Sequence, residues 1–248
     1  MKINFNAIET AAAFLSEGKV VAIPTETVYG LGGNARNREA IQKIFRIKNR
    51  PPTNPLIIHL SHISAMEGYA REIPEAAFIL AERFWPGPLT LVLPKHVSVS
   101  PLVTGGQDSV AIRIPNHPVA LALLEAFGEG IAAPSANRSG ALSPTKALHV
   151  QQGLGNLVDY ILDGGPCLVG IESTIVSLLD DVPVILRQGH ILETEIASAL
   201  GYTTLPTQSK TKIETPGSQF KHYAPKKPLF LLTANELKIE LRGKRCVT

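Results

Sequence analysis

Short apolar runs of the β-strand type alternate with amphipathic helical patterns along most of the chain, and this alternation limits the fold more than any other feature. Strands are predicted near residues 20–23, 56–60, 89–93, 110–114, 131–133, 160–162, 174–178 and 184–186. Helices are predicted near residues 6–17, 40–47, 74–84, 117–127, 145–152 and 193–200. The alternation predicts an α/β fold, and 248 residues suffice for one large domain with or without an appendage.

The composition argues against several classes of protein. Apolar residues make up 44% and charged residues 18%, which is typical of a globular protein. A formal charge of +3 is small for a dedicated nucleic-acid binder. Cys167 and Cys246 lie far apart and lack metal-ligand spacing, so neither a disulfide framework nor a zinc site is predicted. Because signal-peptide and membrane-span patterns are missing, we expect a cytoplasmic protein without a membrane partner.

The segment PTETVYGLGGN, residues 24–34, is predicted to be a glycine-rich loop between a buried strand and a helix. Ligands often bind at this place in α/β sheets. Its glycines match neither the P-loop, which needs a following Gly-Lys-Ser/Thr, nor the dinucleotide fingerprint, whose spacing differs. The loop by itself therefore leaves a ligand site and a plain connection equally open.

The helix after this loop carries apolar residues on one side and basic residues on the other, with Lys43, Arg46 and Arg50 expected to point outward. Lys48 and Arg50 form a basic pair at its end, and we expect Arg50 to be exposed. An ammonium and a guanidinium together can bind phosphate as a point charge and a planar fork. A solvated basic helix end is the alternative interpretation.

Two segments in the middle of the chain place polar groups near predicted strand ends. Pro134–Asn137 follows a strand, where hydroxyl and amide groups can reach a ligand. Ser143 before Pro144 predicts the start of a helix, with serine as its cap and proline at its first position. Such a helix start would also attract phosphate.

The strand near residues 109–114 carries an arginine in an apolar setting. Alternation places Ser109, Ala111 and Arg113 on one face, which is the face able to meet a ligand. A buried arginine requires an anionic partner, because an unpaired charge is costly to bury. That partner is either a structural Asp or Glu or a bound anion.

Six motifs in one fixed order point to a known family. They are PTETVYGLGGN, KNRPPTNPLIIHL, FWPGPLTLVL, SVAIRIPNHP, AAPSANRSGALSPT and IESTIVSL, which begin at residues 24, 48, 84, 109, 132 and 171. Together they resemble the YrdC-like family of threonylcarbamoyl-AMP synthases over about residues 8–200. The resemblance implies a YrdC-like twisted mixed sheet with flanking helices around a central ligand cavity.

The resemblance also implies an activity. Members of the family are nucleotidyltransferases that convert L-threonine, bicarbonate and ATP into threonylcarbamoyl-AMP and pyrophosphate, for the N6-threonylcarbamoyladenosine (t6A37) modification of tRNA. Mg²⁺ is the expected cofactor, held through the ATP phosphates without a protein metal site, in keeping with its preference for substrate oxygens and water. No general base stands out in the sequence, so positioning and charge stabilisation should promote the reaction.

The resemblance assigns roles to individual positions. The catalytic positions are Lys48, Arg50, Ser135 and Asn137. ATP contacts are assigned to Arg50, Asn54, Ser109, Ser135, Ser143, Arg187 and His222. Threonine contacts are assigned to Thr27, His59, Arg113, Ser173 and the backbone of Ala133.

The C-terminal part of the chain departs from the α/β pattern. We expect a catalytic domain at residues 1–202, a linker at 203–225, and at 226–248 the vestigial or truncated start of a C-terminal α/β domain. The linker segment TPGSQFKHYAP, Thr215–Pro225, resembles the one that precedes a second domain in the long form of the family. We interpret it as a lid over the adenylate, because lids exclude water from reactive intermediates; a plain tether is the alternative.

Two other functions compete with this hypothesis. Six basic residues against one acidic residue between Arg36 and Arg50 are compatible with an RNA-binding module without catalysis. A carbamoyl-transfer domain related to hydrogenase maturation would share the fold, but it normally accompanies zinc-finger cysteines, which this sequence lacks. RNA and a downstream transfer protein both stay open as partners.

Overall fold

The computed structural model describes residues 3–206, and nine strands in this range form one mixed sheet. The strand order is β7-β1-β2-β6-β3-β5-β4-β8-β9. The pairs β1–β7, β3–β5 and β4–β8 are parallel, and the other neighbours are antiparallel. The strands are β1 (Val21–Ile23), β2 (Gly30–Asn34), β3 (Ile57–His59), β4 (Leu89–Pro94), β5 (Ser109–Arg113), β6 (Ile131–Ala132), β7 (Tyr160–Ile161), β8 (Thr174–Ser177) and β9 (Val184–Arg187).

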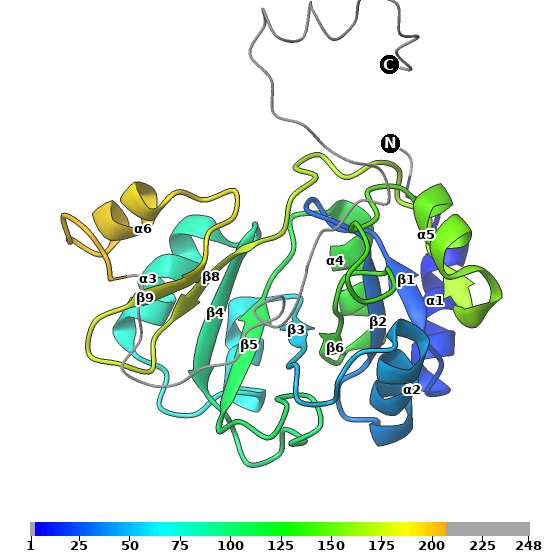
Figure 1. The fold of residues 1–248 in the computed structure, drawn as a ribbon, viewed down its shortest axis with the longest axis horizontal. Helices are drawn as coiled ribbons and strands as arrows, with labels where there is room; N and C mark the ends of the chain where they lie inside the picture. The colour runs from blue at the N-terminus through cyan, green and yellow to red at the C-terminus, as the bar shows by residue number, and fades with distance from the viewer. Residues whose placement is uncertain (1–2, 207–248) are drawn as a thin grey trace, which may run out of the picture.

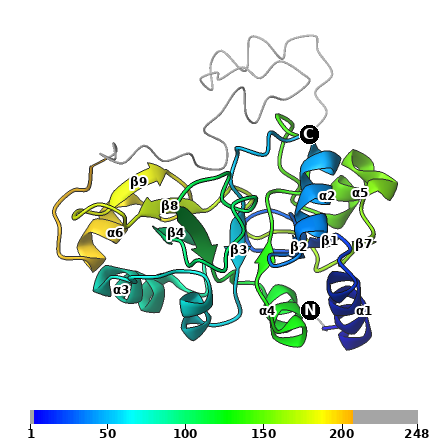
Figure 2. The same cartoon turned by 90° about the horizontal axis from the view of Figure 1, so that it is seen from below.

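Helices cover both faces of the sheet. Figures 1 and 2 show α2 and α5 on one side and α1, α3 and α4 on the other, with α6 beside α3. Asn4 and Asn37 cap the starts of α1 and α2 by accepting main-chain N–H groups, and Gly128 ends α4 in the left-handed conformation. The helices are α1 (Phe5–Ser16), α2 (Arg38–Lys48), α3 (Glu75–Phe84), α4 (Pro118–Phe127), α5 (Ala147–Gly153), α6 (Glu193–Ala199) and the 3₁₀ helices η1 (Ile63–Gly68) and η2 (Gly155–Leu157).

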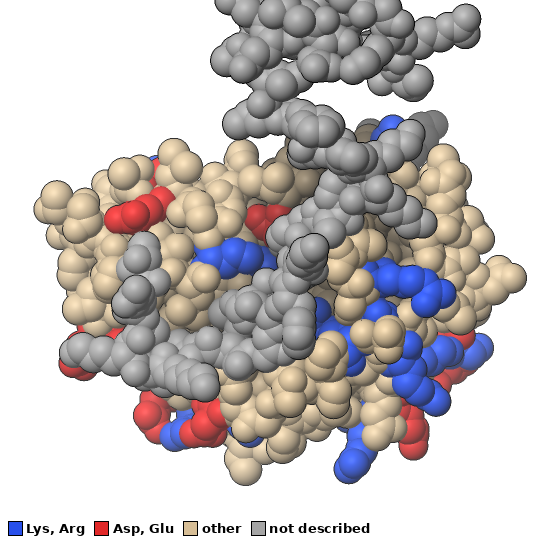
Figure 3. Space-filling view, viewed as in Figure 1, with Lys and Arg blue, Asp and Glu red and all other residues tan. Residues whose placement is uncertain are grey.

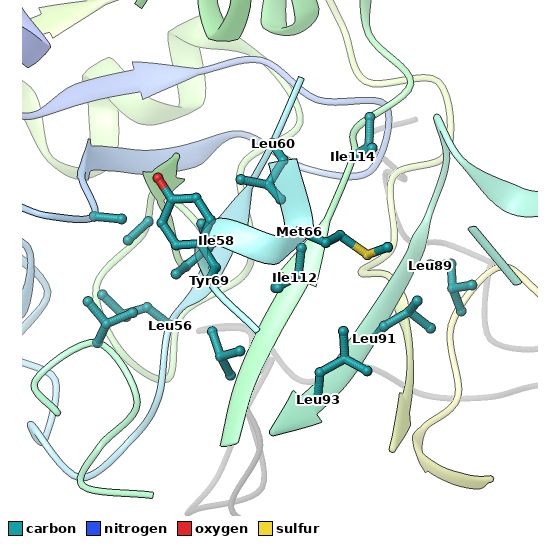
Figure 4. Close-up of a cluster of buried hydrophobic side chains, with 14 of the residues drawn as sticks. Leu56, Ile58, Leu60, Met66, Tyr69, Leu89, Leu91, Leu93, Ile112 and Ile114 are labelled. Atoms are coloured by element: carbon teal, nitrogen blue, oxygen red, sulfur yellow. The ribbon is translucent and has the colours of Figure 1, made fainter. Parts of the chain in front are cut away.

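The main hydrophobic core includes residues of β1, β2 and α2, and its central part lies between the middle strands and the segment that carries η1 and α3. Alternate residues of β3, β4 and β5 point into it, together with Met66 of η1 (Figure 4). The side chains that the strands contribute include Ile58, Leu89, Leu91, Leu93, Val110 and Ile112. The apolar residues of these strands thereby commit one face of the sheet to packing.

The opposite face of the same strands is available for other purposes. Ile57 and Ala111 belong to a small separate apolar cluster on that side. His59 and Arg113 follow two residues later, and the parallel register pairs them directly. Because side chains alternate along a strand, both lie on the face away from the main core, as predicted for Arg113.

The structure confirms the predicted α/β class and mixed sheet, and each strand and helix predicted between residues 3 and 206 is present with ends shifted by a few residues. The predicted loop over residues 24–34 is wrong in its second half, which forms β2. A Cβ at Gly32 would lie 2.8 Å from Cγ2 of Ile131, and one at Gly33 would lie 3.1 Å from Cδ1 of Ile44. The glycines therefore let β2 approach β6 and α2 closely.

The helix predicted to begin at Ser143 begins at Ala147, and Ser143 is not its cap. Ser143 Oγ instead donates a hydrogen bond to Glu172 Oε1 at 2.9 Å. The carbonyl oxygen of Pro144 accepts from Tyr29 N at 2.8 Å. These contacts hold the residues before α5 in a non-helical conformation against the loop that follows β1.

Residues 207–248 lie outside the described part of the chain, and with them lie His222, the proposed lid segment and the predicted C-terminal start at 226–248. The domain boundary at residue 202 stays a prediction. Between residues 3 and 206, no helix combines the length and the apolar character that crossing a membrane requires.

Candidate functional site

Two adjoining cavities lie where loops from distant parts of the sequence meet. The first cavity is lined by the loop after β1, by residues at the ends of β3, β5 and β6, and by the segment before β8. The second cavity runs along residues 142–143, 170–172 and 187–189. Val28, Glu172 and Arg187 line both cavities and so form a shared wall. The strand order brings these segments together, since β6, β3, β5, β4 and β8 are consecutive neighbours in the sheet.

Arg113, at the end of β5, lines the first cavity and is buried. Its Nε donates to the carbonyl oxygen of Gly87 at 3.2 Å, and its Nη1 donates to Thr27 Oγ1 at 2.9 Å. Its Nη2 lies 2.7 Å from Glu26 Oε1, in an ion pair whose side chains are only 4% and 5% exposed. The two groups are not aligned for a hydrogen bond. The N–H groups of Nη2 therefore have no aligned acceptor among residues 3–206. The anionic partner expected for Arg113 is therefore present in the chain as Glu26.

His59 lies beside Arg113 and lines the same cavity. Burial, and secondly the charge of Arg113, lowers the pKa of His59 to about 3. The imidazole is therefore neutral at pH 7. Its Nδ1 has no hydrogen-bond partner among the described residues, which is uncommon for a buried polar atom. His59 thus offers a neutral polar group to a ligand.

The wall shared by the two cavities contains a second arginine–glutamate pair. Arg187 Nη1 lies 2.6 Å from Glu172 Oε2, and both side chains are 15% exposed. Arg187 also donates from Nε and Nη2 to the carbonyl oxygen of Ser173, at 3.0 and 2.9 Å. Ser143 Oγ binds the other oxygen of Glu172. This pair is aligned for hydrogen bonding and partly open to solvent.

Arg50 lines the first cavity, but the expectation that it is exposed is wrong, because only 8% of its surface is accessible. After the last residue of α2, Asn49 adopts a left-handed conformation with φ of 52°, which redirects the chain so that Arg50 does not continue the outer face of the helix. The guanidinium donates to Asn54 O, Asn54 Oδ1 and Pro55 O at 3.2, 2.6 and 2.8 Å. Burial lowers its pKa to about 10, so the group stays charged at pH 7.

Lys48 is buried behind the cavities and lines neither of them. Its Nζ donates to the carbonyl oxygens of Ser135 and Asn137 and lies 3.4 Å from Asn137 Oδ1. Burial, followed by the charge of Arg50, lowers the pKa of Lys48 to about 7. Lys48 thereby fixes the segment from Ser135 to Asn137, of which Ser135 reaches the first cavity.

Most predicted site residues come together in this arrangement. The five positions assigned to threonine all line the first cavity: Thr27, His59, Arg113, Ala133 and Ser173. Among the positions assigned to ATP, the first cavity contains Arg50, Ser135 and Arg187, and the second contains Ser143 and Arg187. Asn54 and Asn137 support Arg50 and Lys48 without lining a cavity. Ser109 begins β5, at the opposite end of that strand from Arg113, and lines neither cavity.

Two glutamates belong to this site although no sequence motif predicted a role for them. Glu26 and Glu172 each precede an assigned residue, Thr27 and Ser173, and this adjacency was the available signal. Among residues 3–206, Glu172 is the only acidic side chain that lines either cavity. The same part of the chain contains no group of three His, Cys, Asp or Glu side chains placed to hold a metal ion. A metal ion here would therefore depend on ligand oxygens together with one carboxylate.

Known proteins are similar to this chain in sequence and in architecture. The Sua5/YciO/YrdC family, described as telomere recombination, matches residues 13–189. A threonylcarbamoyl-AMP synthase of Bacillus subtilis is 47% identical over 97% of this chain and 70% of its own length. A threonylcarbamoyl-AMP synthase of Pyrococcus abyssi is 48% identical over 88% of this chain and 65% of its own length. The chain thus spans about two thirds of the length of these relatives.

A solved structure agrees with both the sequence and the fold. The crystal structure of P. abyssi Sua5 complexed with L-threonine matches with a TM-score of 0.86 and 47% identity, over 91% of this chain and 67% of that chain. The resemblance seen in the six motifs is therefore confirmed over nearly all of the described region. The chain belongs to the Sua5/YciO/YrdC family, in which relatives of this similarity are named threonylcarbamoyl-AMP synthase.

Proposed function

We propose that this chain is a threonylcarbamoyl-AMP synthase, a nucleotidyltransferase that joins L-threonine, bicarbonate and ATP and releases pyrophosphate, toward N6-threonylcarbamoyladenosine in tRNA. The observation that carries the proposal is the gathering of all five positions assigned to threonine around the first cavity. The related Sua5 of P. abyssi was crystallised with L-threonine, which supports threonine as a substrate class. Arg50 and Arg187 line the same cavity, and cationic groups beside the positions assigned to threonine support an adenylation.

In the first cavity, Arg113 is suited to bind the carboxylate of threonine. Gly87, Thr27 and Glu26 orient its guanidinium before a ligand arrives, and Nη2 keeps donors without an aligned acceptor in the described region. Preorganised donors of this kind bind a carboxylate with little loss of side-chain freedom. His59 is neutral at pH 7 because of its lowered pKa, so it does not repel the amino group that has to become a carbamate.

The nucleotide would bind along the shared wall and into the second cavity. Attack of the carbamate oxygen on the α-phosphorus breaks the bond to pyrophosphate, so negative charge grows on the leaving group. Arg50 and Arg187 are planar guanidinium forks suited to stabilise that charge. Lys48 contributes by holding Ser135 in place through its carbonyl contacts.

The protein supplies only some of the oxygen ligands that a Mg²⁺ ion would need at this site. These ligands would come mainly from the ATP phosphates and water, with Glu172 as the carboxylate at the cavities, and the ion would supply neutralisation of phosphate charge. The residues of the chain bind and orient the substrates, and no side chain is required as a nucleophile.

The proposal is tested by measuring pyrophosphate release from the purified chain. Release should require ATP, L-threonine, bicarbonate and Mg²⁺ together, and omission of any one should abolish it. Serine should be a poorer substrate, because loss of one methyl contact weakens binding by ~1–3 kcal/mol. Equal release without threonine would contradict the proposal.

RNA binding without catalysis is the competing function, and it is favoured by basic side chains near α2. Figure 3 shows Lys and Arg atoms gathered over that part of the surface. Arg46 is exposed there, whereas Lys43 is paired with Asp159 at 2.6 Å. Affinity for RNA that falls steeply with salt, in a chain without pyrophosphate release, would support this alternative.

A further inference from the structure

Glu172 places a negative charge where the proposed function requires a polyphosphate. Its Oε2 lies 2.6 Å from Arg187 Nη1, and its Oε1 accepts from Ser143 at 2.9 Å. Glu172 lines both cavities, and no other acidic side chain between residues 3 and 206 does so. A phosphate that approaches Arg187 or Ser143 therefore meets this carboxylate.

The same carboxylate acts on the other cations of the site. Burial is the larger effect and lowers the pKa of both Lys48 and Arg50, while the charge of Glu172 raises the pKa of each. Glu172 is thus a counter-ion shared by Lys48, Arg50 and Arg187. A shared counter-ion stabilises the free protein, since clustered buried cations are costly without a partner. It also repels an incoming polyphosphate.

We propose that Glu172 is the residue that makes polyphosphate binding depend on Mg²⁺. The inference rests on the proposed function, because it needs a polyphosphate at the shared wall. Mg²⁺ commonly binds one or two carboxylates together with phosphate oxygens. With the ion bound between them, the carboxylate and the phosphates are attracted to a common cation. Without the ion, Glu172 competes with phosphate for Arg187 and Ser143.

A purely structural role for the Glu172–Arg187 pair leads to a different expectation. In that case, removing the carboxylate would lower stability and leave the effect of Mg²⁺ on binding unchanged. The pair is 15% exposed on both sides and lines two cavities, so an ion or a ligand can reach it. The Glu26–Arg113 pair is more deeply buried, and Glu26 lines neither cavity.

The test measures pyrophosphate binding to the full chain by isothermal titration calorimetry, in excess Mg²⁺ and in EDTA. For the unchanged protein, Mg²⁺ should strengthen binding by about tenfold or more, as expected when a charge repulsion is replaced by a shared cation. Glu172→Gln should bind pyrophosphate in EDTA about tenfold more tightly than the unchanged protein does, because the repulsion is removed. The effect of Mg²⁺ in this variant should shrink to about twofold or less.

Glu82→Gln is the matched control, because Glu82 is an exposed residue of α3 and the same charge is removed away from the cavities. It should retain the Mg²⁺ dependence of the unchanged protein. An undiminished Mg²⁺ effect in Glu172→Gln would overturn the inference. Absence of pyrophosphate binding by the unchanged protein in both conditions would instead count against the proposed function.

Circular dichroism establishes that each variant is folded. Should Glu172→Gln be unfolded, Glu172→Asp decides the question, because its shorter side chain withdraws the carboxylate from the wall while it keeps the charge. A reduced Mg²⁺ effect in Glu172→Asp supports the inference, and an effect equal to that of the unchanged protein contradicts it.

Discussion

The site contains two arginine–glutamate pairs that differ in burial and in alignment. Glu26 and Arg113 are almost wholly buried and lie 2.7 Å apart without hydrogen-bond geometry. Glu172 and Arg187 are partly exposed and form a direct hydrogen bond at 2.6 Å. The first pair lies beside the pocket assigned to threonine, and the second lies in the wall assigned to the nucleotide.

This difference indicates two ways of preparing an arginine for an anionic ligand. Arg113 is held by groups that a ligand has no need to displace, since Gly87 and Thr27 engage other nitrogens than the one left unaligned. Arg187 is held by the carboxylate of Glu172. A polyphosphate is also negatively charged and would compete with this carboxylate for Arg187. A preorganised group such as Arg113 favours a small substrate of fixed shape, whereas the proposed role of Glu172 is to make polyphosphate binding depend on Mg²⁺.

The largest expected effect is the loss of protein stability when the buried Glu26–Arg113 pair is broken. Arg113→Ala should lower the free energy of unfolding by ~3–5 kcal/mol, because Glu26 would be left as a buried, unpaired charge. Arg187→Ala, the matched change in the partly exposed pair, should lower it by only ~1–2 kcal/mol, since water can reach Glu172. Urea denaturation measures both values. Equal losses in the two variants would remove the distinction between the pairs.

Arg50→Ala extends the comparison to a third arginine. Loss of charge-assisted contacts to phosphate should reduce the rate of pyrophosphate release by about ten- to a hundredfold. Stability should also fall, by ~1–3 kcal/mol, because the acceptors on Asn54 and Pro55 lose their donor. Arg46→Ala is the control, since Arg46 is exposed on α2, the helix that ends just before Arg50, and its loss should change neither quantity. A fully active Arg50→Ala variant would exclude Arg50 from the nucleotide site.

His59 lies in the cavity assigned to threonine, and its neutral state predicts that the free energy of unfolding depends on pH. The pKa of His59 is about 3 in the folded protein and rises to its ordinary value of about 6.5 on unfolding, so the unfolded chain binds the extra proton between these values. The contribution of neutral His59 to the free energy of unfolding is therefore fully present above pH 6.5. It is lost progressively as the pH falls toward 3. At pH 5 the loss should be about 2 kcal/mol.

Urea denaturation at pH 7 and pH 5 measures this loss. His59→Asn should show a smaller decrease between the two pH values than the unchanged protein. His190→Asn, a change at an exposed histidine, should leave the decrease unaltered. An equal decrease in the protein and in His59→Asn would show that the imidazole is not kept neutral by burial.

The smallest effect is expected at Ser143, whose hydroxyl supports the partly exposed Glu172–Arg187 pair. Ser143→Ala removes one hydrogen bond to Glu172 and should lower the free energy of unfolding by ~1 kcal/mol or less, because the site is partly open to water. Thermal unfolding measures this change. A loss above about 2 kcal/mol would mean that the Glu172 side of the site is as rigid as the Arg113 side.

The sequence alone determined most helices and strands of the fold and the strand face on which Arg113 lies. Hydrophobic periodicity depends on neighbouring residues only, so it located the α-helices and, except for β2, the strands of the described region to within a few residues. Strand alternation also predicted that Arg113 faces away from the core, and the motifs identified many of the residues that line the first cavity, although not Glu172. Local patterns were misleading at Ser143, whose hydroxyl binds Glu172, and at Arg50, which a turn at Asn49 redirects.

Only the tertiary structure decided which charges are paired. Glu26 and Arg113 come from separate segments, as do Glu172 and Arg187, and each pair exists because the sheet order brings their segments into contact. The same packing set the burial of Lys48 and His59, and with it the lowering of their pKa values. Burial and charge pairing depend on atoms that are close in space and distant along the chain, and for that reason no local sequence pattern records them.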